Sequence, residues 1–148
     1  METERFYRLR SMMENAFAEG QIEESKKLAH EFLEVAESKK PNWNYGNALH
    51  HANLILGRIS LREGSVEKAR QYLIKAGKTP GSPQLNSFGP NMKLAKELLE
   101  MGEKQTVLEY LELCKVFWKK IFSWMKIRKW KRTIEKGEIP DFRANLLY

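Results

Sequence analysis

The chain has 148 residues, of which 42% are hydrophobic and 30% charged, and a formal net charge of +7. A chain of this size and composition can bury a core as one domain, which excludes a disordered or low-complexity protein. One cysteine excludes an internal disulfide and a cysteine-rich zinc site. The charged first ten residues lack a secretory signal, and no segment reaches the roughly 20 apolar residues of a membrane span. We therefore expect a single cytoplasmic domain over residues 1–148.

The positive charge is concentrated in one segment. Residues 113–134 contain eight basic residues and no acidic one, so the rest of the chain is nearly neutral. The eight are Lys115, Lys119, Lys120, Lys126, Arg128, Lys129, Lys131 and Arg132. Attraction to an acidic partner should therefore act through this segment.

Apolar residues recur at steps of three and four along most of the chain, which predicts an all-α fold. Three helical hairpins are expected, over about residues 3–38, 46–77 and 90–121, with Gly20, Gly64 and Gly102 at their turns. Residues 77–90, which are rich in proline and glycine, are predicted to form a loop. A spacer is favoured over a ligand-binding role for this loop.

The spacing of the apolar residues shifts after the third hairpin, so that they define a different helix face. This face carries Trp124, Ile127, Trp130 and Ile134. The shift predicts a separate helix over about residues 123–136, with Ser123 as its N-cap. These four side chains would face the core and the basic side chains would face solvent, so this helix would cap the array. An extended tail is expected over residues 137–148.

The middle hairpin resembles a tetratricopeptide repeat (TPR). The matching residues are the pair Leu56-Gly57, the turn residue Gly64, and the packing residues Ala69, Leu73 and Ala76. The chain as a whole is similar to uncharacterised bacterial TPR-like proteins. The resemblance implies a right-handed array of about three TPR-like hairpins plus a C-terminal capping helix. It also implies a non-catalytic protein-interaction module that binds a peptide or partner surface on its concave face.

The first helices of the hairpins would line this concave face. The predicted partner-binding residues are Arg10, His51, Leu54, Arg58, Arg62, Lys93 and Lys96. Arg58 and Arg62 are four residues apart and would share a helix face, where two guanidinium groups suit the carboxylate of an acidic peptide or of a peptide C-terminus. A solvated face whose arginines pair with Glu63 or Glu67 is at least as well supported.

The basic helix suggests an alternative function, binding to the anionic surface of a nucleic acid or a membrane. The candidate residues are Lys119, Lys120, Lys126, Arg128, Lys129, Lys131 and Arg132. This function requires exposed tryptophans, whereas buried ones would make the helix a cap with only weak, salt-dependent attraction to polyanions. The spacing of Trp124 and Trp130 favours the cap.

The sequence contains no catalytic or cofactor motif that withstands inspection. The Gly77-Lys78-Thr79 stretch imitates a phosphate-binding loop but lacks its earlier glycine and its preceding strand. His50 and His51 diverge on one helix and have no metal-ligand frame, so solvated or capping side chains are expected. Cys114 lies on an apolar stripe and should be buried. We therefore expect no enzymatic activity, no catalytic residue, no cofactor and no metal.

Overall fold

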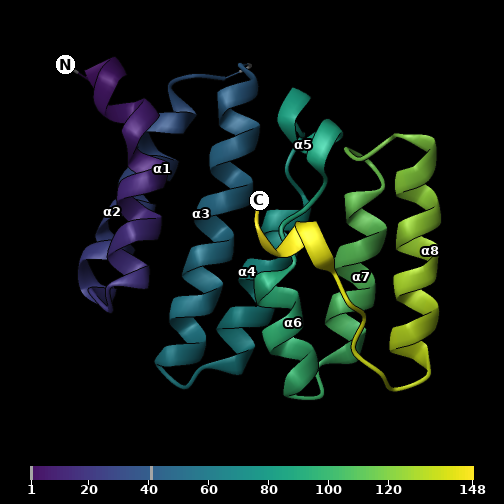
Figure 1. Ribbon diagram of the computed structural model, residues 1–148. Coiled ribbons are helices and arrows are strands. Elements are labelled where there is room, and N and C mark those ends of the chain that lie inside the picture. Colours follow the sequence, from purple (N-terminus) through teal and green to yellow (C-terminus); the bar gives the residue numbers. More distant parts are fainter. Residues whose placement is uncertain (1, 41) are drawn as a thin grey trace.

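The computed structural model describes residues 2–40 and 42–148, which are all-helical with no strand among them (Figure 1). The predicted all-α class is confirmed. The helices are α1 (Glu2–Ala18), α2 (Ile22–Glu37), α3 (Trp43–Arg62), α4 (Val66–Gly77), α5 (Pro83–Phe88), α6 (Lys93–Glu100), α7 (Lys104–Cys114), α8 (Ile121–Glu135) and a 3-10 helix, η1 (Arg143–Leu146). They stand in a row, with α1 and α2 at one end and α8 at the other.

Three glycines end helices in the same way. Gly20, Gly64 and Gly102 have φ angles of 78°, 84° and 83°, a left-handed conformation that glycine adopts without strain. In each turn the next residue donates its N–H to the carbonyl five residues earlier, as Gln21 does to Ala16 at 2.8 Å. These turns join α1 to α2, α3 to α4 and α6 to α7, and the helices of each pair pack together.

Polar side chains cap the starts of three helices. Asn42 and Ser65 each accept a backbone N–H at the first turn of α3 and of α4. Ser82 caps α5 in the same manner, and Pro83 follows it in the first helical turn. The 77–90 segment, predicted as a loop, therefore contains a short helix.

The chain between α7 and α8 differs from the prediction. Helix α7 ends at Cys114, before the predicted residue 121, and α8 begins at Ile121 with no side-chain cap. The intervening Phe117 and Trp118 are buried against the connection between α4 and α6. A Cβ atom at Gly81 would lie 2.7 Å from the Cβ of Phe117, and one at Gly89 would lie 2.5 Å from the Trp118 ring. Because Phe117 and Trp118 pack against the α4–α6 connection, α7 does not continue to residue 121.

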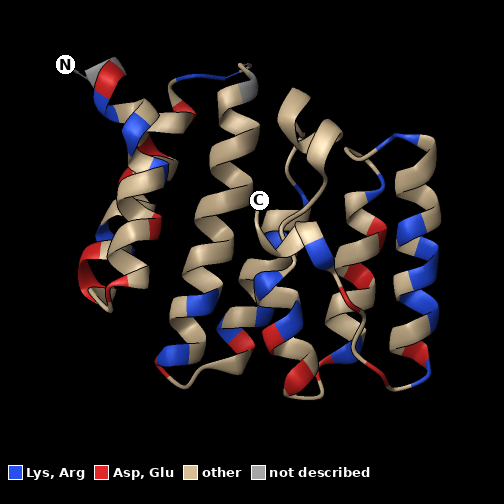
Figure 2. Ribbon diagram, in the orientation of Figure 1, with Lys and Arg blue, Asp and Glu red and all other residues tan. Residues whose placement is uncertain are grey.

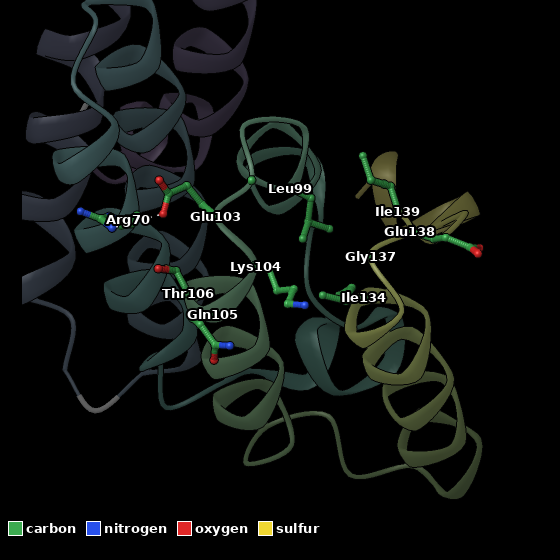
Figure 3. Close-up of a pocket in the computed structure, with 11 residues that line it drawn as sticks. Arg70, Leu99, Glu103, Lys104, Gln105, Thr106, Ile134, Gly137, Glu138 and Ile139 are labelled. Carbon is green, nitrogen blue, oxygen red and sulfur yellow. Dashed lines mark hydrogen bonds and ion pairs between the residues drawn. The ribbon is translucent and has the colours of Figure 1, made fainter.

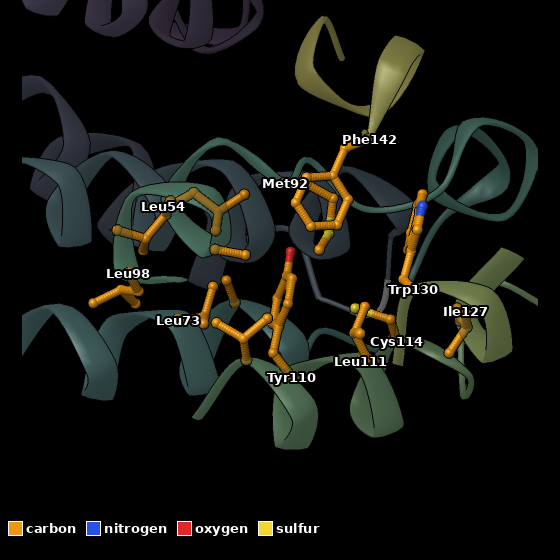
Figure 4. Close-up of a cluster of buried hydrophobic side chains, with 14 of the residues drawn as sticks. Leu54, Leu73, Met92, Leu98, Tyr110, Leu111, Cys114, Ile127, Trp130 and Phe142 are labelled. Carbon is orange, nitrogen blue, oxygen red and sulfur yellow. The ribbon is translucent and has the colours of Figure 1, made fainter. Parts of the chain in front are cut away.

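Buried side chains form two clusters that meet at α3. Ile55, Leu56 and Ile59 pack with residues of α1 and α2, whereas Leu54 belongs to a second cluster that spans α4, α6, α7 and α8 (Figure 4). Cys114 is fully buried in the second cluster, as predicted. The two clusters together connect both ends of the row.

The segment 137–148, predicted as an extended tail, packs back onto the helices. Phe142 is buried against Trp130, with ring centroids 5.1 Å apart. The 3-10 helix η1 follows, and Asn145 within it is buried. The tail crosses α7 and ends close to α3 in Figure 1. The prediction of an extended tail is wrong, because Phe142 packs on Trp130 and the Asn145 side chain bonds the backbone before α6.

Helix α3 approaches α4 and α6 closely at Gly57. A Cβ atom at this position would lie 2.3 Å from Leu94 Cδ2 and 3.2 Å from Tyr72 Cβ. Leu94 is fully buried, so its side chain has little space into which to move. Glycine at position 57 therefore sets the distance between α3 and α6.

We expect Gly57→Ala to lower the free energy of unfolding by about 1–3 kcal/mol, because the added methyl group overpacks the contact with Leu94. Leu94→Ala should also destabilise the protein, because it leaves a cavity. In urea unfolding, the double variant should lose less than the sum of the two single variants, since the shorter side chain makes room for the methyl group. Additive losses would contradict the close packing.

Candidate functional site

Four predicted partner-binding residues line one groove between α1, α3 and the start of α6. They are His51, Leu54, Arg58 and Lys93. The groove has a volume of about 120 Å³, and Tyr148 from the tail forms part of its wall. Arg10, Arg62 and Lys96 do not line it, and Arg10 bonds Glu14 on its own helix at 2.9 Å. The structure thus brings together part of the predicted set.

Arg58 and Arg62 share the carboxylate of Glu97 on α6. Arg58 Nε lies 2.6 Å from Glu97 Oε1, and Arg62 Nη1 lies 2.8 Å from Oε2. Both guanidinium groups also lie over the ring of Phe17, at 4.6 and 5.2 Å from its centroid. The predicted arginine pair is therefore already bound to a carboxylate of the same chain.

The sequence suggested Glu63 or Glu67 as the ion-pair partner of Arg58 and Arg62, but the partner is Glu97. Glu63 bonds Lys26 at 3.1 Å, and Glu67 forms no ion pair with a described residue. Glu97 is 39 residues from Arg58 and comes beside it only because α6 packs on α3. No local spacing in the sequence could have identified this pair.

The two adjacent histidines are buried, so neither side chain is solvated; His50 bonds the last turn of α4, as the capping alternative expected. His50 Nδ1 lies 3.1 Å from the carbonyl oxygen of Ala76, and its Nε2 accepts the N–H of Asn91 at 3.2 Å. Burial lowers the pKa of His50 to about 4, so the ring is neutral and Nδ1 is the donor. The ring therefore joins α3 to α4 and to the segment before α6.

His51 lies in the wall of the groove. It is only 7% exposed and forms no hydrogen bond with any described residue. Burial, followed by the effects of His50 and Arg10, keeps its pKa well below the usual value. The groove therefore contains a neutral imidazole that a ligand could hydrogen-bond.

Asn91 uses all of its polar groups in bonds to different parts of the chain. Besides the bond from its N–H to His50, its carbonyl accepts the hydroxyl of Tyr110 at 2.9 Å. Its side-chain oxygen accepts the N–H of Lys93 at 2.9 Å, and its side-chain amide donates to the backbone oxygen of Tyr148. One buried residue thus links α3, α6, α7 and the tail.

Further bonds attach the tail beside the groove. Asn145 donates from its side chain to the carbonyl oxygens of Phe88 and Pro90, at 3.0 and 2.9 Å. Its own carbonyl accepts the N–H of Met92 at 2.8 Å. The rings of Tyr148 and Phe88 pack with centroids 5.0 Å apart. The tail is therefore held to the segment that follows α5.

A second candidate site lies at the opposite end of the row, around the first turns of α8. We call it the basic aromatic surface. Its exposed apolar residues are Val116, Ile121, Phe122, Trp124 and Met125, and its exposed basic residues are Lys119, Lys120, Lys126, Arg128, Lys129 and Arg132. None of these basic residues forms an ion pair with a described residue. In Figure 2, blue bands follow one another along α8 and mark the connection before it. Lys131, also predicted here, bonds Glu112 instead.

Only part of the predicted inner face of α8 faces the core. Ser123, Ile127, Trp130 and Ile134 are buried, but Trp124 is 52% exposed. Steps of four, three and four residues keep the buried four on one face, whereas Trp124 follows Ser123 directly and is rotated by about 100° from it. The prediction that Trp124 is buried is therefore wrong. The prediction that Ser123 is an N-cap is also wrong, because α8 begins at Ile121 and Ser123 lies within its first turn.

A third feature is a cavity of about 540 Å³ between the α6–α7 turn and the end of α8 (Figure 3). The ion pair between Arg70 and Glu103, at 3.2 Å, lies along it, and Leu99, Ile134 and Ile139 supply apolar walls. Its lining includes no histidine or cysteine. Within residues 2–40 and 42–148 no cluster of three potential metal ligands occurs.

Comparison with protein-family models, with curated proteins and with solved structures finds no match to this chain. Its function must therefore be inferred from the groove and from the basic aromatic surface.

The buried histidines should make stability depend on pH. Since the pKa of His50 is about 4 when folded and near 6.5 when unfolded, the free energy of unfolding should be highest above pH 6.5 and fall by roughly 3 kcal/mol as the pH approaches 4. The lowered pKa values of Glu31 and Glu112 act in the same direction, but only below about pH 4.5.

Urea unfolding between pH 4.5 and 7.5 measures this dependence. His50→Gln should be less stable at neutral pH, because it disturbs two buried hydrogen bonds, and its stability should change less with pH. Equal pH dependence in the two proteins would show that His50 is not the group responsible.

Proposed function

We propose that the protein binds the surface of anionic membranes through the basic aromatic surface. The observation that carries this proposal is the exposure of its apolar side chains. Val116, Ile121, Phe122, Trp124 and Met125 are between 52% and 75% exposed. Four of them lie in the first turns of α8, and Val116 lies in the connection before it. Exposed large apolar side chains so close in the chain mark an interaction surface, because water contact with them is unfavourable.

The charge beside these residues supports an anionic partner. On the outer face of α8, Ile121 and Met125 are one turn apart, and Arg128, Lys129 and Arg132 follow on the next turns. In an amphipathic helix at a membrane, apolar side chains enter the boundary of the acyl chains while basic ones contact the headgroups. Each basic residue near an anionic membrane contributes about 1 kcal/mol.

Membrane lipid fits this surface better than nucleic acid does. Trp124 and Phe122 could stack on bases, but Val116, Ile121 and Met125 have no aromatic ring for stacking. Lipid accepts all five side chains, and indole rings favour the membrane interface. The described helices include none whose length and hydropathy suit a bilayer crossing. The proposed contact is therefore with one face of the membrane.

Removing charge from the surface should weaken binding. Arg128→Gln with Lys129→Gln should lower the affinity for phosphatidylglycerol vesicles about 30-fold, because two basic residues leave the interface. Lys27→Gln with Lys68→Gln removes the same charge from exposed positions on α2 and α4 and should change affinity little. Vesicle co-sedimentation measures both. Equal losses in the two variants, or equal binding of neutral phosphatidylcholine vesicles, would contradict the proposal.

Removing the indole tests the apolar contribution. Trp124→Ala should lower vesicle affinity about tenfold, because the side chain would no longer transfer from water to the membrane interface. Its thermal unfolding should change little, since the indole is mostly outside the core. Binding to single-stranded RNA that depends on Trp124, without binding to vesicles, would instead favour a nucleic-acid partner.

We propose a second function for the groove, as the partner-binding site of a TPR-like arrangement of the three hairpins. The imidazole of His51 favours it, because the ring lines the groove and forms no hydrogen bond with a described residue, which leaves it free to bond a partner. Lys93 is exposed at the same groove and carries the charge that suits a carboxylate. An acidic side chain of a partner protein fits this chemistry and the small volume of the groove.

Lys93 and Lys96 provide a matched pair for testing the groove. Lys93→Gln should weaken the binding of a short aspartate-containing peptide about tenfold, because a charge-assisted hydrogen bond is lost. Lys96→Gln removes the same charge one turn away, outside the groove, and should leave the affinity nearly unchanged. Isothermal titration calorimetry measures both, and the same loss in the two variants would show general charge attraction rather than a site.

A further inference from the structure

A cavity of about 450 Å³ opens beside the first turn of α8, within the basic aromatic surface. It is lined by Lys115, Trp118, Lys119, Lys120, Ile121 and Trp124. Its volume lies in the roughly 300–1,000 Å³ range of small-molecule sites. We infer that this cavity binds the phosphate monoester headgroup of an anionic lipid, an assignment that rests on the proposed membrane function and adds a specific ligand to it.

Three lysines line this one cavity. Lys119 and Lys120 form no ion pair with a described residue, whereas Lys115 shares Glu112 with Lys131. The cavity therefore presents two uncompensated charges and a third that is partly neutralised. A phosphate monoester carries about −1.5 to −2 charges near pH 7 and three acceptor oxygens, whereas a phosphodiester carries one charge. The monoester is the better match in both charge and number of acceptors.

The wall of the cavity is held in place by contacts outside it. The backbone N–H of Lys119 donates to Asn86 Oδ1 on α5 at 3.0 Å. Trp118 is buried, and its ring lies 5.8 Å from that of Trp130. The ammonium of Lys126 lies 5.9 Å from the Trp118 ring. Because the loop is already ordered, little conformational entropy is lost when a headgroup binds.

Two apolar residues at the cavity would place it at the depth of the lipid phosphates in the membrane interface. Ile121 and Trp124 line the cavity and also belong to the exposed apolar set. When these two side chains enter the membrane interface, the lysines beside them lie at the level of the lipid phosphates. A free phosphate ion would gain the charge contacts but not this apolar contribution.

The test compares two anionic lipids at matched surface charge, phosphatidic acid with its phosphate monoester and phosphatidylglycerol with its phosphodiester. The protein should bind phosphatidic acid vesicles about tenfold more tightly. Lys119→Gln with Lys120→Gln should abolish this preference. Arg128→Gln with Lys129→Gln removes the same charge outside the cavity, so it should weaken binding to both vesicles and keep the preference.

Each outcome has a distinct meaning. Equal binding of the two lipids by the unaltered protein would overturn the cavity assignment and leave the membrane function standing. Binding to neither would overturn both. Inorganic phosphate in solution provides the last comparison. Amide shifts of Lys119 and Lys120 that saturate with phosphate at the affinity seen for phosphatidic acid vesicles would show that the cavity takes free phosphate, and would overturn its assignment to a lipid.

Discussion

The buried hydrogen bonds of Asn91 are the constraint on which the rest of the molecule depends. This one residue bonds His50 on α3, Tyr110 on α7 and Tyr148 in the tail. A buried polar group left without a partner costs about 1–3 kcal/mol, so such a set of bonds favours one arrangement strongly. In the part of the chain that the structure describes, every fully buried side-chain nitrogen or oxygen has a partner, whereas the His51 ring reaches the groove. The neutral form of His50 is part of this arrangement, since it must both donate and accept.

The position of the tail extends this constraint to α8. Asn145 bonds the segment just before α6, and Phe142, three residues earlier, packs on Trp130. With Trp130 directed inward, the helical period places Ile127 and Ile134 in the core and turns Trp124 and Met125 outward. The exposed apolar residues are thus a consequence of how the core closes. Their exposure is the observation on which the proposed membrane contact rests.

Local signals in the sequence were sufficient for the helical class, for the glycines that end helices and for the burial of Cys114. Predictions that depended on contacts between residues far apart in the sequence were less accurate. Trp124 was expected in the core because four apolar residues share a line, but the buried Ser123 takes the place that Trp124 would occupy. Glu97 as the partner of Arg58 could not be foreseen, because only the packing of α6 on α3 brings them together. The burial of both histidines depends on the same packing.

The position of the Trp124 indole in the membrane tests the central claim most directly. Its fluorescence would be measured on anionic vesicles whose lipids carry bromine atoms at defined depths along the acyl chains, and a Trp124→Phe variant would supply the signal of the other tryptophans. We expect strong quenching of Trp124 by bromines near the headgroup end of the chains and weaker quenching by those near the chain ends. Quenching that does not differ between the protein and the Trp124→Phe variant would contradict insertion at the start of α8.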